Sequence, residues 1–112
     1  MVLSMEALQA YLYEHYGDRA NEQGLFMKLV EEVGETAEIL NKRAGRKTTG
    51  EGEDLGKELG NELADMIHYI VAIAAINRIN LTKTMIQKDK IAAVKYHHAR
   101  DLETFLARSD ER

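Results

Sequence analysis

Residues 25–40 of the chain read LFMKLVEEVGETAEIL, and the prediction of the fold starts from their apolar pattern. Its apolar side chains return every three or four residues, at Leu25, Leu29, Val33, Ala37 and Leu40. An α-helix turns once in about 3.6 residues, so this spacing places them in one stripe along a single face. We therefore predict a helix over about residues 21–44, which Gly45 ends.

The same helical period continues along the rest of the chain. Proline is absent, and β-branched residues do not alternate with polar ones, so strands are not expected. We predict helices at about residues 4–16, 21–44, 54–79 and 82–107, with a polar, glycine-rich loop at 45–53 (GRKTTGEGE). Ser4 is a suitable N-cap for the first helix, and Asn80 breaks the third. The expected fold is all-α, a four-helix bundle.

Composition limits the classes of function. The 112 residues suit a single domain, 1–112, and the net charge of −4 makes the chain a poor nucleic-acid binder. No cysteine is present, which excludes disulfides and thiolate zinc sites and fits a cytoplasmic location. The apolar run at 66–76 has roughly half the ~20 residues of a membrane helix, and we see no signal peptide, so no membrane partner is expected.

Two pairs of acidic residues lie at the edges of the apolar stripes. Glu32 and Glu35 belong to the helix at 21–44, and Glu62 and Asp65 to the helix at 54–79. Residues three apart project within about 60° of each other, so antiparallel packing of the two helices would let the pairs meet. Like charges about 5 Å apart repel by roughly 1 kcal/mol in water, which a divalent cation would relieve. Oxygen ligands favour Mg²⁺ or Mn²⁺, whereas a merely solvated acidic face remains the alternative.

These residues also carry a resemblance to a known family. The segment 28–35 (KLVEEVGE), followed at 62–65 by ELAD, resembles the E-E-x-x-E and E-x-x-D pattern of MazG-type nucleotide pyrophosphohydrolases, an all-α superfamily. The likeness covers about residues 21–80 and extends more weakly to Tyr96.

The resemblance implies Mg²⁺-dependent cleavage of a nucleoside triphosphate, (d)NTP, to (d)NMP and pyrophosphate, in nucleotide-pool control or housecleaning. It implies that the metal ligands are Glu32, Glu35, Glu62 and Asp65. Glu31 is then a further ligand, a base that orients water, or the partner of a lysine.

Lys28 and Tyr69 are candidate substrate contacts. Lys28, one turn before Glu32, could reach phosphate or pair with the nearby glutamates. Tyr69, four residues after Asp65, could stack on a nucleobase or be a half-buried core residue. His68 is expected in the interior of the bundle or at an interface.

A basic stretch in the fourth predicted helix supplies Lys88, Asp89 and Lys95 as further substrate candidates. Lys88 matches a lysine of the family, but Ala92 stands where an asparagine is expected, and Asp89 could substitute for it. A solvated helix face is the alternative for all three. Residues 46–49 could fold over a triphosphate or form an ordinary surface loop.

The stretch at 66–76 is apolar nearly all round, which implies burial on several sides. We therefore expect the bundle to be completed by oligomerisation, as a homodimer or homotetramer. Three other functions stay open: a phosphoribosyl-ATP pyrophosphohydrolase-like enzyme, an iron-binding carboxylate bundle, and a non-catalytic helical module. Iron-binding carboxylate bundles use E-x-x-H motifs to bind the metal, and this sequence has none.

Overall fold

A computed structural model describes residues 1–46 and 48–110. Within these residues the chain forms five α-helices and one short 3-10 helix and has no strand, so the all-α prediction is confirmed. The helices are α1 (Met5–Tyr16), α2 (Glu22–Arg43), α3 (Leu55–Ile76), α4 (Leu81–Lys95) and α5 (Leu102–Asp110), and the 3-10 helix η1 is Gly17–Arg19. They divide into two compact units, Met1–Ile79 and Asn80–Arg112, each described by itself.

Four of the helices begin at a side chain that caps the first turn. In each, an oxygen of the capping side chain accepts a hydrogen bond of 3.0 or 3.1 Å from the backbone N–H three residues further on. The capping residues of α1 to α4 are Ser4, Asn21, Asp54 and Asn80. Such caps satisfy N–H groups that have no partner within the helix, which is why the helices start at these residues.

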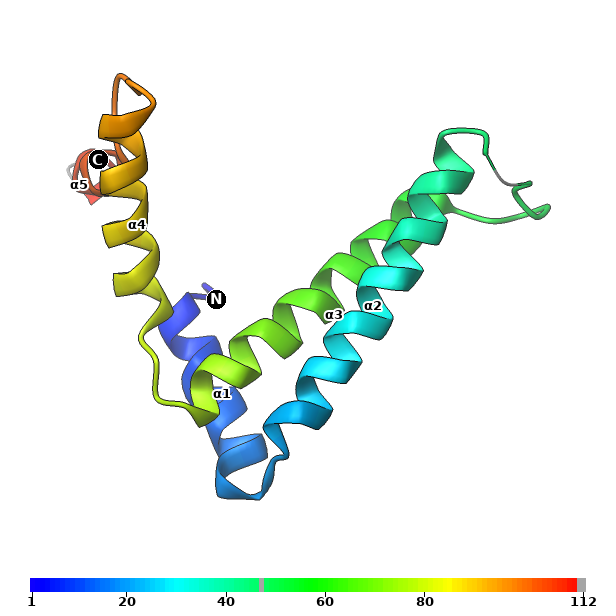
Figure 1. Ribbon diagram of the computed structural model, residues 1–112, viewed down its shortest axis with the longest axis horizontal. Helices are drawn as coiled ribbons and strands as arrows, with labels where there is room; N and C mark the ends of the chain where they lie inside the picture. The colour runs from blue at the N-terminus through cyan, green and yellow to red at the C-terminus, as the bar shows by residue number, and fades with distance from the viewer. Residues whose placement is uncertain (47, 111–112) are drawn as a thin grey trace. The chain divides into compact units, whose positions relative to one another are not determined.

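In the first unit, α2 and α3 run side by side in opposite directions (Figure 1). An ion pair of 3.2 Å between the Lys42 ammonium and the Glu53 carboxylate joins the end of α2 to the segment before α3. Gly45 turns the chain after α2 with a φ of +76°, a conformation that glycine adopts without strain. The hairpin therefore brings the acidic residues of the two helices to one region.

Helix α1 packs against α3 (Figure 1). The two largest fully buried side chains of the described residues are Leu12 and Val71, one from each of these helices. Beside them the Tyr16 hydroxyl and Nε2 of His68 form a hydrogen bond of 2.7 Å. His68 is thus a partly buried residue of the α1–α3 contact, as the sequence suggested.

The apolar stripes are only partly buried in this unit. In α2, Leu25 is buried as expected, but Val33 and Leu40 are 47% and 48% exposed. In α3 the larger side chains Leu63 and Ile67 are about half exposed, and the buried positions are instead Val71, Ala72, Ala74 and Ala75. The buried positions of α3 are thus mostly small residues, whereas large apolar side chains of the hairpin stay about half exposed.

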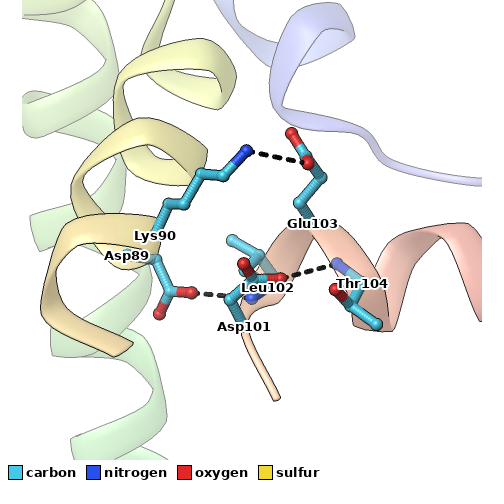
Figure 2. Close-up of polar contacts among 6 residues, drawn as sticks. All are labelled: Asp89, Lys90, Asp101, Leu102, Glu103 and Thr104. Carbon is cyan, nitrogen blue, oxygen red and sulfur yellow. Dashed lines mark hydrogen bonds and ion pairs between the residues drawn. The ribbon is translucent and has the colours of Figure 1, made fainter. Parts of the chain in front are cut away.

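The second unit corrects the prediction of one helix at 82–107. Helix α4 ends at Lys95, because His97 adopts a left-handed φ of +57° and the His98 N–H bonds the Ala93 carbonyl at 2.9 Å. Helix α5 then begins behind Asp101, whose Oδ1 accepts a hydrogen bond of 2.8 Å from the Thr104 N–H (Figure 2). No glycine or proline marks the end of α4 in the sequence. The start of α5 does have a sequence signal, because Asp101 is a common N-cap residue.

Helix α3 also has the length and composition of a membrane span, the one such helix in the described ranges. The apolar part of the sequence is therefore longer than residues 66–76 alone. Core helices of soluble proteins have the same length and composition, so this property does not by itself place the chain in a membrane.

Candidate functional site

Three glutamates from the α2–α3 hairpin form the candidate metal centre. Glu32 and Glu35 of α2 and Glu62 of α3 each offer a carboxylate oxygen, and these oxygens all lie within 4.8 Å of one another. Glu32 and Glu62 are partly buried, and Glu35 is exposed. The three-residue spacing in α2 and the antiparallel partner helix produce this group, as the sequence predicted for these residues.

Without a cation, the negative charges of these carboxylates have no positive charge within the group to balance them. One oxygen of Glu32 and one of Glu62 (Oε2 in each case) are buried and have no hydrogen-bond partner. The pKa of Glu62 is raised to about 7, first because its carboxyl shares a hydrogen bond with Glu32, then by burial, and then by Glu35. Such a bond requires a proton on one carboxyl, because two carboxylates have no donor between them. A divalent cation can replace that proton, and oxygen-only ligands suit a hard one.

Asp65 lies outside the group, although the sequence prediction included it. It follows Glu62 by three residues on α3, but its side chain is exposed and its carboxylate is not among the clustered oxygens. Glu32 and Glu35 have the same three-residue spacing and both join the group, so it is the side of α3 that faces α2, and not the spacing itself, that leaves Asp65 outside.

Glu31 and Lys28 form an ion pair with each other. The Lys28 ammonium lies 3.4 Å from the Glu31 carboxylate, and both side chains are about 60% exposed (59% and 60%). Of the three roles left open for Glu31, lysine partner is the one that this geometry displays. An exposed pair of this kind contributes little to stability, so either residue is free to exchange partners.

Glu58 is an acidic residue that the sequence analysis missed. Its Oε2 is buried and has no hydrogen-bond partner, as in Glu32 and Glu62. It precedes Glu62 by four residues, a spacing that puts both side chains on one face of α3. That spacing is the feature of the sequence that could have identified it.

A contact between Thr36 and Met66 sits one turn from the glutamates. The buried Thr36 hydroxyl donates a hydrogen bond of 2.8 Å to the Glu32 carbonyl and lies 3.3 Å from Sδ of Met66. It therefore ties the backbone that carries Glu32 to the neighbouring helix. This contact helps to fix the register of α2 against α3 on which the glutamate group depends.

Tyr69 is half-buried within a row of aromatic rings. Its ring meets the His68 ring edge-on at 5.0 Å between centroids, and His68 meets Tyr16 in the same way at 5.7 Å. Burial, with a smaller effect of Tyr69, raises the pKa of Tyr16. The geometry therefore accounts for Tyr69 as a packing residue, and stacking on a nucleobase stays a prediction.

The predicted contacts at Lys88, Asp89 and Lys95 belong to α4, in the second unit. The Asp89 carboxylate accepts a hydrogen bond of 2.6 Å from the Leu102 N–H and so holds the start of α5 (Figure 2). The Lys95 ammonium lies 5.3 Å from the centre of the Tyr96 ring, and Lys88 is exposed. Asp89 thus has a structural role that the sequence did not reveal.

The loop proposed to cover a triphosphate is only partly described. Arg46, Thr48 and Thr49 are exposed, and Lys47 lies outside the described residues.

A scan against protein-family models finds no match for the chain, and searches of curated proteins and of solved structures find none either. The fold and the site therefore define an all-α chain. Its antiparallel helical hairpin carries a cluster of carboxylates that could hold a metal ion.

Proposed function

We propose that the chain is a Mg²⁺-dependent nucleoside triphosphate pyrophosphohydrolase, which cleaves a (d)NTP to (d)NMP and pyrophosphate. One observation carries the proposal: Glu32, Glu35 and Glu62 converge within 4.8 Å, and two of them bury an oxygen that has no partner. The E-E-x-x-E and ELAD segments that resemble MazG-type enzymes supply the same residues. The cluster itself does not select Mg²⁺ over Mn²⁺, and both fit its oxygen ligands.

In this proposal the three glutamates hold the cation, and Asp65 completes the ligand set from the exposed edge of α3. When bound, Mg²⁺ would neutralise phosphate oxygens and lower the pKa of a coordinated water. A carboxylate that is not a ligand could accept the proton of the attacking water. Glu31 suits that role because its carboxylate is exposed and is held by an exposed ion pair with Lys28.

The substrate contacts are proposed on charge and position. Lys28 is an exposed cation one turn before Glu32, and Tyr69 lies seven residues after Glu62 on α3. Lys88, Asp89 and Lys95 are the candidates from α4. A net negative chain needs such cations, together with the metal, to attract a triphosphate.

We further propose that the chain acts in the cytoplasm, as a homodimer or homotetramer that completes a four-helix bundle. The half-exposed apolar residues of α2 and α3 support association, because a hairpin alone cannot bury them.

The test is a substrate panel. The protein is stripped of metal with a chelator, supplied with Mg²⁺ and mixed with each NTP and dNTP, and pyrophosphate and monophosphate are both measured. We expect equimolar release of the two products from at least one nucleotide, and none without the cation. Absence of release from every nucleotide would overturn the proposal.

Two additions to the panel separate the alternatives. Release from phosphoribosyl-ATP alone would favour the histidine-synthesis type of enzyme. A visible absorbance that develops with Fe²⁺ and oxygen, without pyrophosphate release, would favour the iron-binding bundle, and neither activity would favour the non-catalytic module.

A further inference from the structure

Of the described acidic residues, only Glu58 has a buried oxygen without a partner and yet lies outside the glutamate group. Three side chains have such an oxygen, at Oε2 in each case, and the other two are Glu32 and Glu62. A buried carboxylate oxygen that accepts no hydrogen bond costs free energy, because burial removes it from water without a replacement. The Oε2 of Glu58 therefore needs a donor that the described residues do not supply.

Glu58 lies on the same side of α3 as Glu62. Four residues of an α-helix differ by only about 40° around the axis and by about 6 Å along it, so side chains at this spacing are neighbours. Glu58 is partly buried, as Glu62 is, whereas Asp65 at the other end of this row is exposed. Glu58 therefore extends the glutamate group by one turn, towards the start of α3, on its buried side.

A cation bound by the glutamate group would bring the missing donor with it. Glu32, Glu35 and Glu62 each offer one oxygen, whereas Mg²⁺ takes about six and usually keeps several waters. A water about 2.1 Å from the ion donates over about 2.7 Å, so it reaches an acceptor about 4–5 Å from the ion. A carboxylate one helical turn from a ligand can lie at that distance.

We propose that Glu58 accepts a hydrogen bond from a water coordinated to the cation of the glutamate group, and so is a positioning residue of that site. Glu58 is not itself a ligand in this arrangement, because its oxygens are not among those that lie within 4.8 Å of one another. A hydrogen bond from a metal-bound water to a carboxylate is charge-assisted, and it fixes the orientation of the ion's shell. The inference rests on the cation site of the proposed function and does not depend on hydrolysis.

The first test measures the affinity of chelator-treated protein for Mn²⁺ by isothermal titration calorimetry. We expect Glu58→Gln to weaken binding on the order of 10-fold, the usual effect of losing a partner of the metal shell. The matched control is Glu38→Gln, which removes the same charge from an exposed residue of α2 outside the group. At physiological salt this control should change the affinity by no more than about twofold, because exposed charges are screened.

A second variant separates the hydrogen bond from the charge. Glu58→Asp keeps the negative charge but withdraws the carboxylate by one methylene, about 1.5 Å. We expect it to bind Mn²⁺ about as weakly as Glu58→Gln, because its oxygen no longer reaches the water. Native affinity in Glu58→Asp would show that the charge alone acts on the cation, and would overturn the proposed hydrogen bond.

Two further measurements distinguish a positioning role from a structural role and from direct ligation. The metal-free melting temperature of Glu58→Gln should not fall, because the substitution removes a buried charge that has no partner. Water-proton relaxation of the Mn²⁺ complex reports how many waters the ion holds. This number should be the same in Glu58→Gln and in the native protein, whereas loss of a direct ligand would add a water.

The outcomes separate the claims. A native protein that binds no Mn²⁺ would overturn both the cation site and this inference. Native affinity in Glu58→Gln, an equal loss in Glu38→Gln, a lower metal-free melting temperature or an added water would overturn the role of Glu58 alone. Binding of Mn²⁺ that depends on Glu58, without pyrophosphate release from any nucleotide, would overturn the hydrolase and leave this inference intact.

Discussion

The carboxylate of Asp89 accepts a 2.6 Å hydrogen bond from the main-chain N–H of Leu102, thirteen residues further along the chain. This N–H belongs to the first turn of α5, where no carbonyl of the helix itself can pair with it. Asp89 and Asp101 thus share the start of α5 between them. The bond is a specific tie between α4 and α5.

We predict that Asp89→Ala destabilises α5 by about 1 kcal/mol, the usual cost of losing a cap. Hydrogen exchange at the Leu102 amide should accelerate, whereas Asp89→Asn, which keeps an acceptor oxygen, should retain most of the protection. Glu103→Gln is the control, because it removes only an exposed ion pair with Lys90. Unchanged exchange in Asp89→Ala would show that the bond is absent in solution.

Glu35→Gln should abolish pyrophosphate release, with a loss on the order of 100-fold or more, because an amide is a poor substitute for an anionic ligand. Helicity should be unchanged. Glu38→Gln alters an exposed acid on the same helix that lies outside the group, and it should keep its activity. Full activity in Glu35→Gln would remove this residue from the ligand set.

Asp65→Asn should also abolish turnover if Asp65 joins the ligands when the substrate complex forms. Its carboxylate lies outside the clustered oxygens, so this variant decides between four ligands and three. Isothermal titration calorimetry with Mn²⁺ gives an independent test, since loss of a true ligand would weaken the affinity of Asp65→Asn for the ion. If Asp65→Asn kept the turnover and the Mn²⁺ affinity of the native protein, the metal ligands would be the three glutamates alone.

The metal-free protein should lose stability as the pH rises through neutrality. The pKa of Glu62 is about 7 in the folded chain, above its usual 4.5, so the folded state binds more protons than the unfolded state between these values. The stabilisation is complete below about pH 4.5 and is lost as pH passes about 7. Melting temperatures of chelator-treated protein at pH 5.5 and 8 should therefore fall with pH.

Glu62→Gln should flatten that dependence, and Mg²⁺ should restore stability at pH 8 in the native chain only. A metal-free melting temperature that rises between pH 5.5 and 8 would show that Glu62 does not hold its proton in the folded state.

Leu12→Ala should cost about 2–5 kcal/mol, because it leaves a cavity at the α1–α3 contact, where Leu12 is fully buried. Val94→Ala, at a side chain that is 76% exposed, should change stability by no more than about 0.5 kcal/mol. Urea denaturation of both variants measures the difference. Similar midpoints would mean that α1 is not packed on α3 in solution.

The sequence predicted α1, α2 and α3 to within a few residues, because their caps and apolar periods agree. It failed between α4 and α5, where His97 takes a left-handed conformation usually left to glycine or asparagine. The hydrogen bond from the Leu102 N–H to the Asp89 carboxylate holds α5 to α4 after this turn, and pattern analysis along the sequence does not detect such tertiary bonds.

The candidate site was also predictable only in part, because the sequence does not reveal contacts between helices. Helical spacing located Glu32, Glu35 and Glu62, but spacing along one helix does not determine which side of α3 faces α2. That register excludes Asp65 from the cluster and buries an oxygen of Glu58. Both outcomes depend on packing between helices.

The Lys42–Glu53 ion pair has a consequence for how this protein can evolve. It joins the two ends of the hairpin directly, so the closure of the hairpin does not rest on the connecting segment alone. Doubling the length of such a connection costs only about 0.6 kcal/mol in closure entropy. Insertions between these two residues can therefore accumulate while Glu32 and Glu62 keep their positions. Such insertions can then be selected for the binding of new ligands.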